Sequence, residues 1–394
     1  MHPGGISVLL EQNIAGQDAT EAFFSLHRYE VLQRPQYARL QIGTVVGQKQ
    51  TIFPRAVGTL SRVPYAEPTW LTEGYHSPYY KDHHRAFQKR MRIFVDEMLY
   101  PDAQALQEKG KMPSKKILQE LARLNVHAMR LGPGEHLKGL TLMDGTVTPE
   151  QFDFFHELIM GQEMSRIHAR GYHDGIAGGT MIGLPAIKNF AKPAVREKIL
   201  SEVLRGEKLV CLAISEAFAG SDVAGTRTFA KKSDDGKYWT VTGTKKWITN
   251  GHFADYFITG CRTEKGMVVL LIERGEGIET KHINTSYGPA SGTAFVTFDQ
   301  VKVPVEHTLG PDDGNGLAVI LSNFNHERWT TQRQVFGKPL NSQAVIRAKL
   351  AAMISRVESA QVWLENVTYQ MNHMSYREQS ALLAGCVKPF SALL

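Results

Sequence analysis

Two side chains near the middle of the chain could hold a flat aromatic group. Trp247 and Thr249 lie two positions apart in GTKKWITNG, a segment that alternates like a strand. Side chains two apart in a strand project from the same face, so the indole and the hydroxyl would point together. An indole wall beside a hydrogen-bonding hydroxyl suits a planar heterocycle. We therefore expect a site for such a ring here.

The segment CLAISEAFAGSDVAG, residues 211–225, could contribute to the same site. Ser215 and Ser221 carry hydroxyls, and Gly220 lets a ligand approach the backbone closely. From the residues alone, a strand that leaves a sheet through an ordinary turn remains the simpler interpretation. The segment predicts a ligand site only when it is combined with the Trp247 segment.

Glu327 is a candidate proton acceptor. It follows Phe324 by three residues and Ile320 by seven, which places its carboxylate on the apolar stripe of a predicted helix. Burial there would raise its pKa and favour its use as a general base. The alternative is an ordinary ion pair with Arg328 or a neighbouring lysine.

Three blocks of predicted secondary structure must position these residues. Helical periodicity begins after Asp82, and the period changes to two between Leu209 and Pro304, which predicts strands. Helix returns after Gly316. Within the first block, helices are expected to start at Asp82, Pro113–Ser114, Thr148–Pro149 and Pro193.

Three local expectations concern the helical block. The helix near Thr148 is expected to bury Phe152, Phe155, Leu158 and Ile159. The pair His83-His84 is expected in a solvated first turn of its helix. The segment GIAGGTMIG, residues 175–183, follows no strand and is interpreted as a helix-packing turn.

The pair SEAFAGSD and KKWITNG resembles the acyl-CoA dehydrogenase family of flavoenzymes, from about Pro78 to Leu383. Ala217 stands where that family usually has proline. The resemblance implies a multidomain α+β fold with a central β-barrel-like domain between an α-helical N-terminal domain and an incomplete C-terminal helical domain. The implied parts are a linker at 44–78, the N-terminal domain at 79–207, the middle domain at 208–312 and the C-terminal domain at 313–394.

The resemblance also implies roles for individual residues. Glu327, immediately before Arg328, would be the catalytic base, and Ser221, Asn325 and Arg328 would lie near the acyl-CoA. Val335 replaces the family's usual threonine beside the cofactor-binding residues. The residues expected to contact FAD are Leu212, Ile214, Ser215, Gly220, Ser221, Trp247, Thr249, Arg333 and Phe336.

The activity implied by the resemblance is FAD-dependent α,β-dehydrogenation of an acyl-CoA thioester in fatty acid metabolism. Glu327 would remove the α-proton while flavin N5 takes the β-hydride. An acceptor protein such as an electron-transfer flavoprotein would receive the electrons, and intact relatives are expected to be homo-oligomers. An acyl-CoA oxidase that uses O2 is one alternative.

A second alternative is a catalytically inactive truncated fragment that binds acyl-CoA or another protein. Relative to the family, about twenty residues, or roughly 30 Å of helix, are missing between Arg328 and Phe336. The chain also ends at Leu394, before the last helices expected of the family.

Residues 1–43 resemble part of a cytochrome b5 haem-binding module, through HPGG, DATEAFFSLH and QIG. The resemblance implies that His2 and His27 ligate haem iron, with haem b as a second cofactor. Asp18 and Glu21 have the spacing of a capping box, which places His27 one turn beyond Phe23. Two ordinary surface histidines are the alternative.

Composition excludes several other classes of protein. Lys and Arg number 45 against 39 Asp and Glu, so the net charge of +6 is no nucleic-acid signature. No apolar run is long enough for a membrane span. Cys211, Cys261 and Cys386 lack metal-site spacing. We expect a soluble intracellular protein with reduced thiols, in a compartment that the sequence leaves open.

Overall fold

The computed structural model describes most of the middle of the chain and short stretches near both ends. The chain divides into two compact units, Met1–Arg62 and Val63–Leu394. The described residues are 16–24, 27, 40–43, 45–47, 56–61, 67–107, 109–286, 288–312, 314–322, 334–335, 338–339, 351–352, 355–356, 359, 362–363 and 366.

The described part of the first unit contains the short helix α2, Thr20–Phe24. Asp18 Oδ1 accepts a hydrogen bond from the Thr20 backbone N–H at 2.9 Å, which caps the helix. The ring of His27 stacks on Phe23 with centroids 4.6 Å apart. The expected position of His27 one turn beyond Phe23 is therefore confirmed, whereas His2 lies outside the described residues.

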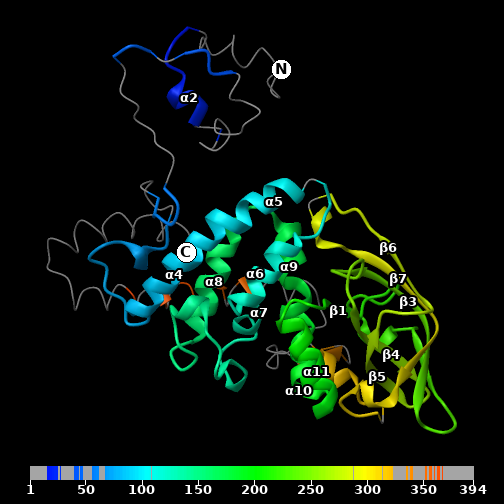
Figure 1. The fold of residues 1–394 in the computed structure, drawn as a ribbon. Coiled ribbons are helices and arrows are strands. Elements are labelled where there is room, and N and C mark those ends of the chain that lie inside the picture. Colours follow the sequence, from blue (N-terminus) through cyan, green and yellow to red (C-terminus); the bar gives the residue numbers. More distant parts are fainter. Residues whose placement is uncertain are drawn as a thin grey trace. The chain divides into compact units, whose positions relative to one another are not determined.

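The first part of the second unit is helical, as the sequence predicts (Figure 1). Ser114 caps the helix that follows it, because its hydroxyl accepts a hydrogen bond from the Ile117 N–H at 3.4 Å. The helical segments are η2 Thr69–Leu71, α4 Asp82–Phe94, the π-helix η3 Val95–Leu99, α5 Tyr100–Leu106, α6 Lys115–Arg123, α7 Val126–Met129, η4 Glu135–Leu137, η5 Met143–Gly145, α8 Phe154–Ser165, α9 Arg170–Ile182, α10 Leu184–Phe190 and α11 Pro193–Leu204.

Helix α8 differs from the expectation in its start and in its buried face. Asp153 is its N-cap and accepts from the N–H groups of Phe155 and His156, so the helix begins at Phe154 and not near Thr148. Leu158, expected in the core, is 47% exposed. The buried face carries His156, Ile159, Met160, Glu163 and Met164. Two of these buried residues, His156 and Glu163, are polar, and apolar periodicity cannot reveal buried polar positions.

A buried arginine joins α4 and α8. Arg92 Nη2 lies 2.7 Å from Glu163 Oε1, and Arg92 Nη1 lies 2.8 Å from Glu67 Oε1. Trp70 is also buried, and its ring stacks on Tyr80 at 4.0 Å. Glu67 and Trp70 belong to the stretch that the sequence presents as a linker, yet they pack into the helical core.

Eight described strands of the second unit form one bent sheet in the order β6-β7-β3-β2-β4-β5-β8, with β1 also pairing with β4. Phe257 of β4 and Phe298 of β7 meet edge to face at 6.0 Å, so β7 packs over β4. Among the described strands no ladder joins the end strands β6 and β8, so the pairing does not show the expected barrel-like closure. The strands of this sheet are β1 Val210–Ala213, β2 Phe229–Lys232, β3 Tyr238–Ile248, β4 Tyr256–Thr263, β5 Gly266–Glu273, β6 Ile278–His282, β7 Ala294–Pro304 and β8 Thr308–Leu309. Two further short strands, β9 Gln334–Val335 and β10 Lys338–Pro339, pair with each other in a separate antiparallel sheet.

Among the described residues, three apolar cores hold the second unit together. The first lies among the helices, the second lies between α10, α11 and one face of the sheet, and the third lies inside the bend of the sheet. Helix α12, Leu317–Ser322, adds Val319 and Ile320 to the second core. Cys211 and Cys261 are buried free thiols. No helix in the described ranges is long and apolar enough to cross a membrane.

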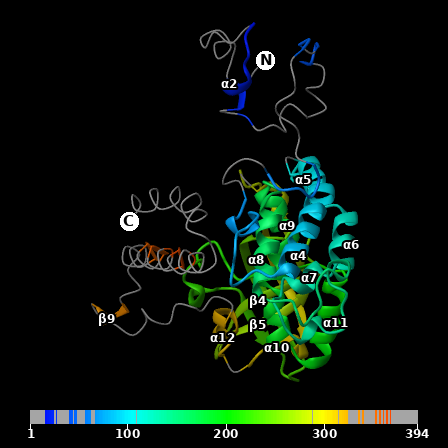
Figure 2. The same cartoon turned by 90° about the vertical axis from the view of Figure 1, so that its left-hand side faces the viewer.

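Helix α9 packs tightly against the sheet through its glycines (Figure 2 shows the helices in front of the strands). A Cβ added to Gly179 would lie 1.7 Å from the Val210 carbonyl oxygen, so only glycine permits this approach of α9 to β1. The segment 175–183 therefore serves in packing, as expected, but most of it forms a continuous helix and not a turn.

Candidate functional site

The two chemistry-bearing segments of the sequence meet at one end of the sheet. Strand β1 ends at Ala213 and runs into a loop whose Ser215 carbonyl oxygen accepts a hydrogen bond from the Lys246 N–H at 2.9 Å. Ser215 is half-buried, whereas Gly220 and Ser221 are exposed. The structure thus brings the loop after β1 and the end of β3 together, as the sequence predicts.

A bulge in β3 exposes Trp247. Lys245 pairs with Val296 of β7, and Ile248 pairs with Ala294 of β7. Strand β3 therefore carries one extra residue between these two pairs. Trp247 takes φ = +67°, an uncommon conformation for a bulky residue, and its side chain is 54% exposed. The bulge turns the indole outward, away from the core that its neighbours fill.

The same bulge overturns the expectation that Trp247 and Thr249 project from one face of a strand. Strand β3 ends at Ile248, so Thr249 lies in the following turn. Thr249 is half-buried beside α9, where a Cβ added to Gly178 would lie 3.1 Å from its Cγ2 atom. The rule of alternating side chains fails because the extra residue in β3 interrupts the pleat.

A buried ion pair supports the loop after β1. Lys245 Nζ donates to Glu216 Oε1 at 2.8 Å, to the Gly260 carbonyl at 2.7 Å and to the Ile214 carbonyl at 3.0 Å. Burial opposes ionisation of Glu216, but the hydrogen bonds from Lys245 and Thr228 and from the Arg227 N–H outweigh it and lower the pKa of Glu216 to about 2. The pair holds the loop at both of its ends.

Asn250 joins the site to the helical layer. Its Nδ2 donates to the carbonyls of Asp174 and Ser291 at 3.1 and 3.0 Å, and its Oδ1 accepts from the Gly179 N–H at 2.7 Å. Sequence reasoning missed Lys245, Glu216 and Asn250 as positioning residues. The sequence offered only weak signals: Glu216 lies inside SEAFAGSD, and Asn250-Gly251 reads as an ordinary turn.

The exposed part of the loop leaves room for a ligand. A Cβ added to Gly220 would meet no atom within 4 Å. Within the described residues the Ser221 hydroxyl makes no hydrogen bond, so it can serve a ligand. The exposed rings of Phe218 and Trp247 each lie under a cation, Arg227 at 5.3 Å and Lys246 at 4.8 Å. Exposed aromatic faces and basic groups suit a planar ligand that carries phosphate.

Helix α12 reaches the start of the same loop. A Cβ added to Gly260 would lie 3.2 Å from Cδ1 of Ile214 and 3.2 Å from Cδ1 of Ile320. The two isoleucines therefore converge over one glycine of β4. Leu212, which is half-buried in β1, packs against the same core. Ile320 of α12 therefore lies near Ile214, at the start of the loop that the sequence assigns to the cofactor.

Five of the expected site residues lie outside the described residues, so their side chains are not placed. These are Asn325, Glu327, Arg328, Arg333 and Phe336.

Family models match the chain in three consecutive segments. The N-terminal domain of acyl-CoA dehydrogenases matches residues 81–207, the middle domain matches residues 211–301 and the C-terminal domain matches residues 328–386. The first match begins at residue 81, so the haem-module resemblance of residues 1–43 gains no support from these matches.

Individual proteins agree with the family models. The acyl-CoA dehydrogenase apdG of Emericella nidulans is 34% identical over 83% of this chain and 81% of its own length. The structure of butyryl-CoA dehydrogenase from Megasphaera elsdenii is 26% identical, with a TM-score of 0.55 over 75% of this chain and 80% of that chain. An acyl-CoA dehydrogenase from Bacillus anthracis in complex with FAD shares the fold at 22% identity, with a TM-score of 0.56 over 77% of this chain and 56% of that chain.

Proposed function

Because the chain belongs to the acyl-CoA dehydrogenase family, whose reaction is the FAD-dependent dehydrogenation of an acyl-CoA thioester, we propose that the loop after β1 and the β3 bulge bind FAD. We further propose that Glu327 is the catalytic base. The observation that carries the proposal is the hydrogen bond between Ser215 and Lys246, because it unites the two motif segments in one site.

The described residues fit an FAD group. The open space above Gly220 allows the cofactor to approach the backbone, and the exposed indole of Trp247 can lie against a flat ring. Ser215, Ser221 and Thr249 supply hydroxyls, while Leu212 and Ile214 form the apolar edge. When bound, FAD supplies the hydride acceptor for the β-carbon.

The proposed base acts on the α-carbon. The carboxylate of Glu327 would take the α-proton, which requires it to be ionised and shielded from water. Support comes from α12, where Val319 and Ile320 are buried, and from the sequence, in which Glu327 follows Ile320 by seven residues, the spacing of one helix face. The contact of Ile214 and Ile320 with Gly260 would bring the segment to the cofactor loop.

Further residues and partners belong to the same proposal. Ser221, Asn325 and Arg328 would contact the acyl-CoA, and Arg333 and Phe336 would contact FAD. The electrons would then pass to an acceptor protein such as an electron-transfer flavoprotein. The domain boundaries drawn from the sequence and a homo-oligomeric state remain predictions.

Anaerobic mixing of the full chain with acyl-CoA thioesters of increasing length tests this proposal through bleaching of the flavin spectrum. We expect Glu327→Gln to keep its flavin but to be reduced at least about 100-fold more slowly. The control is Glu306→Gln, which removes an exposed glutamate and should be reduced like the wild type. Equal reduction rates in Glu327→Gln and the wild type would refute the assignment.

Admission of O2 to the reduced protein separates the alternatives. Rapid reoxidation with formation of peroxide would identify an acyl-CoA oxidase, whereas slow reoxidation supports the dehydrogenase. A colourless protein that binds acyl-CoA without turnover would identify an inactive fragment.

We keep haem binding by His2 and His27 as a separate proposal for the N-terminal unit. Support is limited to the sequence resemblance and to His27 itself, whose Nδ1 lies 3.2 Å from the Phe23 carbonyl oxygen. A carbonyl can only accept, so Nδ1 carries the proton and Nε2 is the acceptor nitrogen, the form that ligates iron. A Soret band that His27→Ala abolishes would support haem, and its absence from the wild type after haem addition would refute it.

A further inference from the structure

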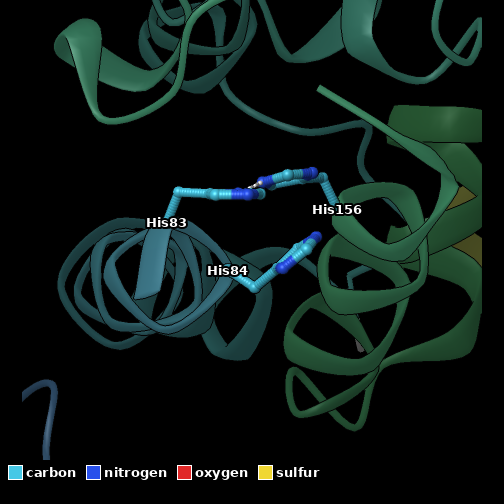
Figure 3. Close-up of side chains that lie close together, drawn as sticks. All are labelled: His83, His84 and His156. Carbon is cyan, nitrogen blue, oxygen red and sulfur yellow. Dashed lines mark hydrogen bonds between the residues drawn. The ribbon is translucent and has the colours of Figure 1, made fainter. Parts of the chain in front are cut away.

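Three histidines from two helices converge away from the proposed FAD site (Figure 3). His83 and His84 lie in the first turn of α4, and His156 lies in the first turn of α8. His83 Nδ1 is 3.0 Å from His156 Nε2, and one nitrogen from each of the three rings lies within 4.8 Å of the others. His84 and His156 are fully buried, so the expectation of a solvated pair at His83-His84 is wrong for His84.

We propose that His83, His84 and His156 form a binding site for a divalent transition-metal ion of the Zn²⁺ type. Imidazole nitrogens lie about 2.0–2.1 Å from Zn²⁺, so two ligands of a tetrahedral site are roughly 3.3 Å apart. The distance of 3.0 Å between His83 Nδ1 and His156 Nε2 is already close to that value. The half-buried His83 marks the side from which an ion and a water ligand could enter.

Asp153 orients the cluster in the way that outer carboxylates orient metal-binding histidines. Its Oδ1 lies 2.8 Å and its backbone N lies 3.1 Å from His156 Nδ1, and these two contacts turn Nε2 of that ring toward His83. Burial lowers the pKa of His83, and it lowers that of His156 to about 4. The ligand role of the two rings follows from their geometry, since one nitrogen from each lies within 4.8 Å of the other.

The surroundings contain charges of both signs. The N-termini of α4 and α8 and the ammonium of Lys81 oppose a cation, while the carboxylates of Asp82 and Asp153 favour it. Imidazole ligands prefer transition metals to Mg²⁺ or Ca²⁺, which prefer oxygen. We therefore expect micromolar binding of Zn²⁺ and no comparable binding of Mg²⁺.

His84 must rearrange to become the third ligand. Its Nδ1 accepts the Lys81 N–H at 2.8 Å, so Nε2 carries the proton and donates to Asp153 at 3.1 Å. Ligation through Nε2 moves that proton to Nδ1, which breaks the hydrogen bonds of the ring to Lys81 and to Asp153. These two hydrogen bonds are together much weaker than a structural metal site, so this exchange favours ligation.

Titration of the metal-stripped, untagged full chain with ZnCl2 tests the site by calorimetry. We expect one saturable site, weakened at least roughly tenfold by His83→Gln. This variant keeps the helix caps, because the His83 ring bonds to His156 and caps neither helix. The control is His252→Gln, which breaks a stacked histidine pair in another part of the fold and should bind Zn²⁺ like the wild type.

Thermal unfolding supplies a second readout that does not depend on catalysis. Zn²⁺ should raise the melting temperature of the wild type and of His252→Gln, and it should raise that of His83→Gln much less. The proposal is overturned if micromolar Zn²⁺ gives no saturable binding. It is equally overturned if His83→Gln binds as tightly as the wild type, or if His252→Gln is the variant that loses binding.

Discussion

Lys245 Nζ lies 2.8 Å from Glu216 Oε1 inside the sheet unit, and both side chains are buried. The two residues belong to the two motif segments, so their ion pair joins the loop after β1 to the end of β3. A buried charge is costly unless it is paired and hydrogen-bonded, and here each partner satisfies the other. The pair therefore positions the loop that we assign to FAD.

Removal of the lysine charge should destabilise the protein strongly. In Lys245→Met the carboxylate of Glu216 stays buried without its cation, which should lower the free energy of unfolding by about 3–5 kcal/mol. Urea denaturation measures this change. Lys246→Met is the matched control, because Lys246 lies over the exposed Trp247 ring and its loss should cost no more than about 1 kcal/mol. Equal effects of the two variants would contradict the supporting role of the pair.

Acid should lower the stability of the folded protein, partly because Glu216 becomes protonated. Its pKa is about 2 in the folded protein, against an ordinary value of 4.5, so the unfolded chain binds the proton first. Stability from this group is complete above about pH 5 and is lost as the pH falls toward 2, by up to about 3 kcal/mol. The free energy of unfolding, measured across this pH range, should change less steeply with pH for Glu216→Gln than for the wild type. The control Glu279→Gln, at an exposed position of β6, should keep the wild-type slope.

Two glycine-to-alanine changes should separate cofactor binding from folding. Gly220→Ala adds a methyl group to open space, so the FAD-free protein should unfold within about 0.5 kcal/mol of the wild type while its affinity for FAD falls. Gly179→Ala drives a methyl group into the Val210 carbonyl and should cost about 3 kcal/mol or more. Fluorescence titration with FAD and thermal unfolding measure the two effects. Wild-type FAD affinity in Gly220→Ala would argue against a cofactor at this loop.

The left-handed backbone at Trp247 predicts an unusual order of stabilities. Glycine normally destabilises a strand relative to alanine, but at φ = +67° the order should reverse, by about 1 kcal/mol. We therefore expect the FAD-free Trp247→Gly protein to be more stable than Trp247→Ala, and both to bind FAD more weakly than the wild type. Chemical denaturation compares the variants. A less stable glycine variant would show that this conformation carries no strain.

Local patterns in the sequence were enough for the order of helices and strands. The buried positions of α4, such as Phe87 and Met91, repeat at helical spacing, and Ser114 signals the start of α6 through a hydrogen bond only three residues away. The motif pair also predicted that Ser215 and Trp247 share a site; the structure brings their two segments together, and their binding role stays a prediction. These features depend on near neighbours, which periodicity and spacing record directly.

Tertiary structure alone decided how the polar side chains pair. Lys245 reaches Glu216 because the end of β3 lies beside the loop after β1, and His83 meets His156 from 73 residues away because Asp153 starts α8 beside α4. Asn250 bonds to α9 only once the glycines of that helix allow close contact with β1. No local pattern records such contacts, since each depends on the packing of elements that are distant in sequence. The sequence by itself therefore determined the elements and the motif pair, and the fold decided which polar groups became partners.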